Sequence, residues 1–355
     1  MVGASSRAPT SGERRRRSGT EPALKTVLVA GLGEVGVRAA RQLIDTPGVD
    51  RVIVAARQLE HAREVATALH DGAEPYRLGR DDALPADLDV VVAALPGEAD
   101  AALARRAVGA GVAYASAADR DATLRSLLAL GTEAQSHETR VIAGCGLAPG
   151  LTDVLARHAV GALDSVDELH VARWGVAGSE SAAEARRAQR EEAREWREGE
   201  LVHEKHRHAE LIWYPDPVGA RECELVATGV ELLVAANPGA GRITARLGVP
   251  PAKRFTPPGR RDPGLGWGAV RVEAWGWRGT ARTSVVYGVI ERTGVAAGTV
   301  LGVTGALLCG ALPGLEGAPT SGAFGLGAVV EPVPFLAELA RRGVKAAAFE
   351  GVAVA

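Results

Sequence analysis

The sequence predicts an α/β protein: a doubly wound parallel sheet followed by a second, α+β domain with a mixed or antiparallel sheet. From residue 24 to about 150, short apolar runs alternate with amphipathic segments, which is typical of a parallel sheet with helical crossovers. Beyond residue 163 this alternation ends, and two long strand-like runs joined by Arg278-Gly279 indicate an antiparallel hairpin. The two patterns together predict one parallel and one mixed sheet.

Six apolar runs with helices between them are expected to form the parallel sheet. The run from Val90 to Leu95 is apolar on both faces, as a central parallel strand should be, and Pro96-Gly97 ends it. We expect strands at 26–30, 51–56, 74–78, 89–95, 112–117 and 140–145, and helices at 34–46, 59–70, 98–110 and 121–137.

The later part of the chain is expected to combine the hairpin with further helices. Leu169, Val171 and Trp174 indicate a strand, and a highly charged helix is expected from Glu180 to Trp196. The remaining expectations are a hairpin of 270–277 with 281–290, a helix at 332–342 and a strand at 344–349. The chain thus divides into a disordered tail (1–22), a first domain (23–160), a second domain (161–312) and a segment that returns to the first domain (313–355).

Composition and charge exclude several classes of function. The chain has 355 residues, a formal net charge of −2 and three widely spaced cysteines, Cys145, Cys223 and Cys309. This balance gives no electrostatic case for binding nucleic acid or a membrane surface, and the cysteines offer no disulfide framework. Residues 1–22 lack the apolar core of a signal peptide, so we expect a cytoplasmic protein. The uncharged stretch 295–312 has the length of a membrane span, but its small residues and lack of basic flanks favour a buried helix.

A glycine-rich loop directly follows the first strand and precedes the first helix. Gly31 permits a tight turn, Gly33 lets the backbone approach a pyrophosphate, and Gly36 lets the helix pack closely on the strand. In this strand–loop–helix context the pattern G-x-G-x-x-G predicts a Rossmann dinucleotide site, the alternative being a glycine-rich turn without a ligand. The expected cofactor contacts in the loop are Gly31, Leu32, Gly33, Glu34, Val35 and Gly36.

The end of the second strand indicates which dinucleotide is bound. A carboxylate about 20 residues after the glycine loop would bind a ribose 2′-hydroxyl, but this strand ends in Ala56-Arg57. Alanine removes the repulsion of a 2′-phosphate, and the planar guanidinium of Arg57 can pair with it. The sequence therefore favours NADP(H) over NAD(H), unless Arg57 is merely a solvated residue. Further cofactor contacts are expected from Ala56, Leu95, Pro96, Gly97, Ser116 and Gly146.

Several segments together resemble the saccharopine dehydrogenase-like reductases. They are GLGEVG at 31–36, DVVVAALPG at 89–97, ARRAVGAGVAYASAADRD at 104–121, VIAGCGLAPGLTDVLA at 141–156 and LAELARRGV at 336–344. The resemblance implies NAD(P)(H)-dependent reduction or oxidation of a carbon–nitrogen bond in an amino-acid-derived substrate. Where relatives commonly have Asp-Arg, this chain has Ala56-Arg57, and where many have Val-Asp after the tyrosine, it has Ala115-Ser116, with Asp119 only later.

Asp119, Lys205 and Arg221 are the candidate catalytic residues. Asp119 lies in a loop at the carboxyl end of a parallel strand, where a carboxylate could stabilise a cationic C=N group. Lys205, in the polar run His203 to His208, and Arg221 could bind substrate carboxylates, the alternatives being a solvated loop and a surface charge. The spacing in this run matches no standard zinc site, so no metal is expected.

Together these observations predict an NADP(H)-dependent reductase of an imine formed from an amino acid or amine, acting as a homodimer. One alternative is an amino-acid dehydrogenase working oxidatively, as a lysine dehydrogenase does. Another is a redox-inert NADP-binding protein that keeps the fold without its chemistry.

Overall fold

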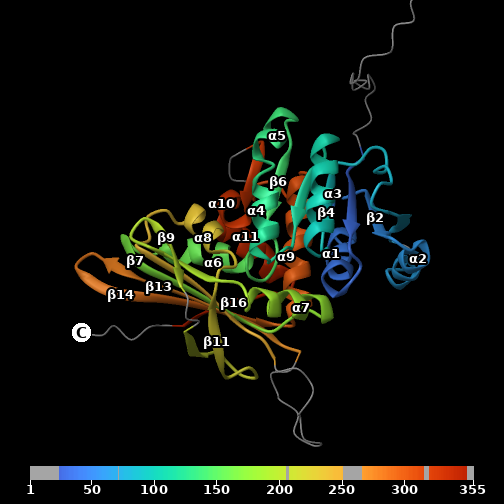
Figure 1. Ribbon diagram of the computed structural model, residues 1–355. Coiled ribbons are helices and arrows are strands. Elements are labelled where there is room, and N and C mark those ends of the chain that lie inside the picture. Colours follow the sequence, from blue (N-terminus) through green and yellow to red (C-terminus); the bar gives the residue numbers. More distant parts are fainter. Residues whose placement is uncertain (1–23, 71, 205–207, 251–265, 316–319, 350–355) are drawn as a thin grey trace, which may run out of the picture.

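The computed structural model contains two separate sheets with helices packed around and between them (Figure 1). The structure describes residues 24–70, 72–204, 208–250, 266–315 and 320–349. The first sheet, with the chain's earlier strands, and the second sheet, with the long hairpin, are held together by helices packed between them. The predicted fold class, a doubly wound parallel sheet plus a mixed sheet, is confirmed.

The first sheet is parallel throughout and, within the described residues, has seven strands in the order β15-β6-β5-β4-β1-β2-β3. This order reverses beside β1, which creates a crevice outside the carboxyl ends of β1 and β4. The strands are β1 (Thr26–Ala30), β2 (Arg51–Ala56), β3 (Glu74–Arg77), β4 (Val90–Ala93), β5 (Ala113–Ser116), β6 (Arg140–Ala143) and β15 (Gly322–Gly325).

Helices cover both faces of the first sheet because its strands are apolar on both sides. Alternate residues of β1 face different cores: Val27 and Val29 pack in one, Leu28 and Ala30 in the other. One face carries α1 (Glu34–Ile44), α2 (Leu59–Ala68) and α9 (Thr293–Leu308), and the other carries α3 (Gly97–Gly109), α4 (Asp121–Leu128) and α5 (Gly131–Ser136).

The second sheet is mixed, with the strand order β10-β11-β12-β7-β13-β14-β16 and with β8 and β9 attached at β12. Its central pair β7–β12 is parallel, and the other pairs are antiparallel. The strands are β7 (Ser165–Trp174), β8 (Ala193–Arg197), β9 (Glu200–Glu204), β10 (Ala209–Trp213), β11 (Ala220–Val226), β12 (Arg242–Gly248), β13 (Gly268–Arg278), β14 (Ala281–Glu291) and β16 (Ala346–Phe349). The further helices are α6 (Leu151–Val160), α7 (Ser179–Ala188), α8 (Val230–Ala236), α10 (Leu326–Val329) and α11 (Pro332–Arg341).

The helix predicted from Glu180 to Trp196 is wrong in its second half. The helix α7 ends at Ala188, and residues 193–197 form the strand β8. Arg194 and Glu195 are buried there and form ion pairs with Asp121 and Arg242, so tertiary ion pairing overrides the helical pattern of the charges. The helix predicted at 121–137 is likewise divided into α4 and α5.

The C-terminal segment divides between the two sheets. The strand β15 extends the first sheet beside β6, whereas β16 pairs with β14 of the second sheet. The uncharged stretch at 295–312 forms most of the buried helix α9, as predicted, and α9 packs along α1. Among the described residues, no helix is both long enough and apolar enough to cross a membrane. The domain boundaries themselves stay a prediction.

Glycines allow α9 to approach α1 closely. A Cβ at Gly298 would lie 2.5 Å from the carbonyl oxygen of Val35, and one at Gly302 would lie 2.7 Å from Cβ of Gln42. Such distances leave no room for a methyl group, so these two glycines set the separation of the helices.

We expect Gly298→Ala to lower the free energy of unfolding by about 1–3 kcal/mol, because the new methyl group forces the two helices apart. Gly109→Ala is the matched control, since a Cβ at this helical glycine would meet nothing within 4 Å. Alanine should raise stability there by up to about 1 kcal/mol. Urea denaturation measures the free energy of unfolding of both variants. Equal changes in the two variants would contradict the close packing of α9 on α1.

Candidate functional site

The glycine loop after β1 has the geometry that a dinucleotide site requires. Gly31 has a φ of +88°, and a Cβ on it would lie 2.3 Å from the carbonyl oxygen of Ala94. A Cβ on Gly36 would lie 1.8 Å from the carbonyl oxygen of Gly31, whereas a Cβ on Gly33 would meet nothing within 4 Å. Gly31 and Gly36 are therefore required by packing, and Gly33 leaves open space before the N-terminus of α1 for a phosphate group.

Glu34, the acidic residue in this loop, is exposed and directed toward two other helices. A Cβ on Gly294, in the first turn of α9, would lie 2.9 Å from Oε2 of Glu34, and one on Gly178, before α7, would lie 4.0 Å from Oε1. The positive ends of the α7 and α9 dipoles favour a carboxylate at this position. Glu34 is thus accommodated beside the loop by helix termini, while Leu32 is buried and Val35 is half-buried.

A cavity of about 870 Å³ lies at the carboxyl ends of β1, β2 and β4. Its lining includes Ala56, Arg57, Arg80, Leu95 and Pro96. Arg57 and Arg80 are exposed, and neither side chain forms an ion pair or hydrogen bond with any described residue. Two uncompensated guanidinium groups therefore border the end of β2, where a 2′-phosphate is expected.

Arg80 was not predicted from the sequence, although a signal for it exists. It follows the end of β3, and β3 pairs in parallel with β2, so the residues after both strands lie at the same edge of the sheet. Arg106 of α3 holds this segment by donating hydrogen bonds to the carbonyl oxygens of Arg80, at 2.9 Å, and of Asp82.

Ser116 lies at the end of β5, but its side chain points into the protein. Its hydroxyl donates to Oδ2 of Asp100 at 2.5 Å, and the hydroxyl of Tyr114 donates to Oδ1 at 2.5 Å. Burial raises the pKa of Asp100 to about 7, against the opposing effect of these two donors. Oγ of Ser116 also accepts a hydrogen bond from the backbone N–H of Ala118, at 2.9 Å. Ser116 is fully buried, and its carbonyl oxygen accepts a hydrogen bond from the N–H of Cys145 at 2.6 Å, so it fixes the loop after β5 and exposes no group to a cofactor.

Gly146 belongs to a compact turn that follows β6. Its N–H donates to the carbonyl oxygen of Pro149 at 3.1 Å, and Gly150 adopts a φ of +127° before α6 begins. Cys145, directly before it, is fully buried, and burial raises the pKa of its thiol. This turn is therefore a compact, hydrogen-bonded segment that lies beside the loop after β5.

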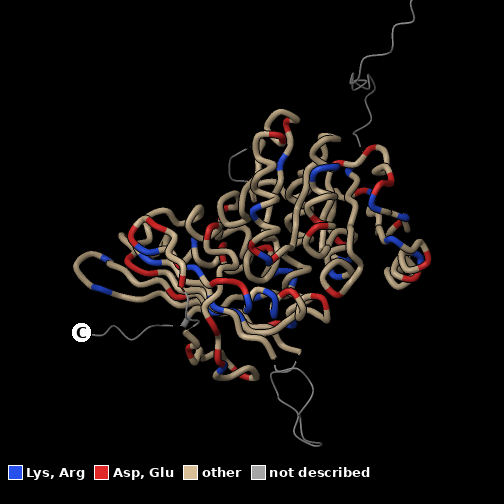
Figure 2. The backbone as a smooth tube through the Cα atoms, viewed as in Figure 1, with Lys and Arg blue, Asp and Glu red and all other residues tan. Residues whose placement is uncertain are grey.

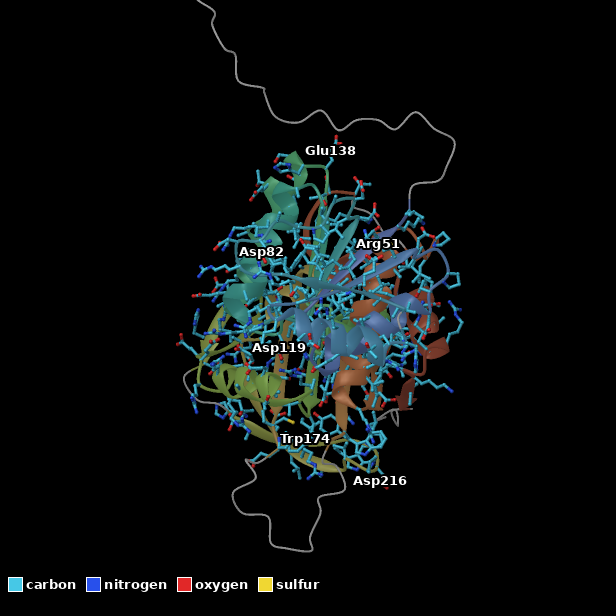
Figure 3. The ribbon with its side chains drawn as sticks, turned by 90° about the vertical axis from the view of Figure 1, so that its right-hand side faces the viewer. Arg51, Asp82, Asp119, Glu138, Trp174 and Asp216 are labelled. Atoms are coloured by element: carbon cyan, nitrogen blue, oxygen red, sulfur yellow. The ribbon has the colours of Figure 1, made fainter. Side chains whose placement is uncertain are left out.

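Three consecutive charged residues after β5 bind three partners from the second domain. Arg173 of β7 donates to Oδ2 of Asp119 at 2.7 Å, and Arg120 pairs with Glu191 at 3.0 Å. Arg194 of β8 pairs with Asp121. We call these six residues the interdomain clasp: Asp119, Arg120, Asp121, Arg173, Glu191 and Arg194. Figure 2 shows acidic and basic segments close together at this junction, and Figure 3 shows Asp119 between the first sheet and Trp174.

Arg173 is the functional candidate that sequence reasoning missed. Its side chain is only 7% exposed and lies on the inward face of β7, at the period-2 positions that Leu169 and Val171 also occupy. An arginine on the apolar face of an expected strand was the available signal, because a buried guanidinium requires an anionic partner.

Of the two predicted catalytic residues that the structure describes, Asp119 lies in the loop after β5, at the carboxyl edge of the first sheet, and is paired with Arg173. Arg221 lies 4.9 Å above the ring of Trp174, which follows Arg173 in β7 and therefore points to the opposite face of the second sheet. Lys205 lies outside the described residues. In the same run, His203 bonds to Glu192 at 3.0 Å, and the described residues contain no cluster of side chains that could hold a metal ion.

Asp153, in the first turn of α6, borders a small cavity between α6 and the second sheet. It is 1% exposed, Thr152 donates to its Oδ1 at 3.1 Å, and its Oδ2 has no hydrogen-bond partner among the described residues. Burial raises the pKa of Asp153 to about 7, although hydrogen bonds from Thr152 and Gly150 oppose the shift. Between pH 3.8 and about pH 7 the folded protein therefore keeps a proton on this carboxyl group, whereas the unfolded chain releases it.

Comparison with known proteins agrees with this architecture. Residues 15–112 match the model of the shikimate / quinate 5-dehydrogenase family. The chain resembles the solved apo saccharopine dehydrogenase (L-Glu forming) of Saccharomyces cerevisiae, with a TM-score of 0.64 and 14% identity over 92% of this chain and 100% of that one. It also resembles the C. glutamicum DAP dehydrogenase in complex with DAP, with a TM-score of 0.47 and 14% identity over 91% and 100% of the two chains. At the level of the fold, the saccharopine dehydrogenase-like resemblance is confirmed, and the first domain is of the NAD(P)-binding type.

We expect Asp153→Asn to stabilise the protein at about pH 8, by about 1–3 kcal/mol, because it removes a buried charge without a full set of partners. Burial raises the pKa of Asp153 from its ordinary 3.8 to about 7 in the folded state, so the stability that this group contributes is fully present below pH 3.8 and is lost as the pH rises from there to about 7. At about pH 3, where the carboxyl group is protonated in both the folded and the unfolded state, the two proteins should therefore be equally stable in urea denaturation. Asp45→Asn, at an exposed position, should change little at either pH, and a loss of stability in Asp153→Asn at about pH 8 would show that the ionised carboxylate has a partner.

Proposed function

We propose that the protein is an NADP(H)-dependent reductase of a C=N bond in a substrate that carries a carboxylate, derived from an amino acid or amine. The observation that carries this proposal is the distribution of charge along the carboxyl edge of the first sheet. Uncompensated Arg57 and Arg80 line the cavity at the carboxyl ends of β1 and β2, which we call the outer end of the crevice. The ion pair of Asp119 and Arg173 lies in the loop after β5, which we call its inner end. A phosphorylated dinucleotide fits the first pair, and a cationic C=N group with a carboxylate fits the second.

The residues of the outer end fit NADP(H). The open space at Gly33 accepts the pyrophosphate before α1, and the cavity beside Ala56 accepts the adenosine. Arg57 and Arg80 would bind the 2′-phosphate, with no carboxylate at the end of β2 to repel it. When bound, NADPH supplies a hydride, and NADP⁺ accepts one.

At the inner end, Asp119 and Arg173 would act on the two charges of the substrate. Arg173 presents a planar guanidinium that can bind a carboxylate, and Asp119, 2.7 Å from it, can stabilise the positive charge of a protonated C=N group. Such a group is already electrophilic, so the protein needs to orient it, to exclude water and to keep its nitrogen protonated. The clasp and the rigid turn at Gly146 would supply that orientation.

A homodimer is part of this proposal. Large apolar side chains are exposed on the second domain: Leu211 at 74%, Trp213 at 54% and Trp277 at 41%. Exposed aromatic and apolar side chains of this kind are typical of protein–protein interfaces. Leu211 and Trp213 lie on the same face of the edge strand β10, so a second copy of the chain packed against this edge would cover these two side chains.

We expect Arg57→Ala to weaken NADPH binding about tenfold or more, since a hydrogen bond to a charged group contributes about 1.5–3 kcal/mol. The dissociation constant for NADH should change by less than about twofold, because NADH lacks the 2′-phosphate. Fluorescence titration of both cofactors measures this. Equal losses for NADPH and NADH would rule out a role of Arg57 at the 2′-phosphate.

We expect Arg173→Lys and Asp119→Asn to affect different kinetic constants for reductive amination of 2-oxo acids with a panel of amines. Arg173→Lys should raise KM about tenfold, because lysine loses the bidentate contact with a carboxylate. Asp119→Asn should mainly lower kcat, because it removes the charge that stabilises the cationic group. The dissociation constant of NADPH is the control and should stay unchanged in both variants. If both variants had a lower thermal stability but unchanged kcat and KM, the pair of Asp119 and Arg173 would have a purely structural role.

A further inference from the structure

A second large cavity lies on the side of α1 away from the crevice. It measures about 1130 Å³ and is bordered by α1, the end of α2, the helix α7 and the first turn of α9. It shares no lining residue with the crevice cavity beside Arg57. The two cavities are therefore lined by different residues, and the second one lies between α1 and residues of the second domain.

Four arginines line this second cavity. Arg38 is held in the wall by hydrogen bonds to Oγ1 of Thr299, at 3.2 Å, and to the carbonyl oxygen of Arg342, at 3.4 Å. Arg41, Arg186 and Arg292 form no side-chain hydrogen bond or ion pair with any described residue, although most arginines of the second sheet do. Three guanidinium groups without counter-ions thus face one cavity.

The acidic residue in the lining, Glu34, marks one end of the cavity. Glu34, Arg38 and Arg41 lie on one face of α1, and Arg41 lies about two helical turns, roughly 10 Å, from Glu34. The negative part of a ligand is therefore expected near Arg41 and Arg186, away from Glu34.

Much of the remaining lining is apolar, and it includes one aromatic ring. Val37, Leu69, Val176 and Val295 contribute aliphatic surface, and Trp267 contributes a half-buried indole. An inorganic anion would leave this surface uncovered, whereas an organic anion with an aromatic or apolar group would cover it.

We propose that this cavity binds an organic phosphate that carries an aromatic or apolar group. A phosphate dianion can accept several charge-assisted hydrogen bonds from the guanidinium groups of Arg41 and Arg186. The aromatic or apolar group packs beside Trp267. This site does not depend on the reaction proposed above, because the arginines that would bind the phosphate do not line the cavity beside Arg57.

Phenyl phosphate is the probe that tests the proposal, titrated calorimetrically into the full chain with and without saturating NADPH. We expect binding with the same affinity in both conditions, because the two cavities are separate. Benzoate, with one charge fewer, and inorganic phosphate, without a ring, should each bind at least about tenfold more weakly. Arg41→Ala and Arg186→Ala should each weaken phenyl phosphate binding about tenfold or more, since each removes a charge-assisted contact.

Arg105→Ala is the matched control, since Arg105 is an exposed arginine of α3 that lines neither of these cavities. It should leave the affinity for phenyl phosphate unchanged. Circular dichroism checks that each variant is folded, and Arg41→Lys should restore part of the affinity. Equal affinities in the Arg41, Arg186 and Arg105 variants would overturn the proposal, as would competition by NADPH or equal binding of benzoate.

Discussion

The ion pairs of the interdomain clasp set how the two sheets stand relative to each other. Asp119, Arg120 and Asp121 are consecutive, directly after β5, and each pairs with a residue of opposite charge from β7, β8 or the segment before β8. Arg173 and Arg194 are each 7% exposed, so removing one partner would leave a nearly buried charge uncompensated. Breaking such a pair typically costs about 3–5 kcal/mol. The inner end of the crevice is therefore held at one width by electrostatics that water screens poorly.

A hydrogen-bonded network on the α3 face of the first sheet holds the interdomain clasp in place. The buried carboxylate of Asp100 accepts hydrogen bonds from Tyr114 and Ser116, and Ser116 accepts one from the N–H of Ala118, which precedes Asp119. Asp100 belongs to α3, the helix whose N-terminus also lines the cavity at the outer end of the crevice. One helix thus positions both the loop at the inner end of the crevice and part of the wall at its outer end.

The parts of this arrangement that depend on local pattern could be predicted from the sequence. Runs of apolar residues predicted the strands of the first sheet, and the spacing of Gly31, Gly33 and Gly36 predicted the loop, because each acts through its own neighbours. Arg173 and Arg194 could not be assigned in the same way. Their partners Asp119 and Asp121 lie 54 and 73 residues away, and a charge in a single sequence is more often solvated than paired.

The arginines of this fold include two kinds: some form nearly buried ion pairs, and others line a cavity without a carboxylate partner among the described residues. Arg173 and Arg194 are nearly buried and each has a carboxylate partner, so they contribute to the position of the second domain. Arg57 and Arg80 line a cavity and have no such partner among the described residues, so their charge is available to a ligand. Arg173 is paired with Asp119, so in the proposed function a substrate carboxylate would share or replace that partner. Binding of an acidic substrate would then be coupled to the ion pairs that hold the domains together.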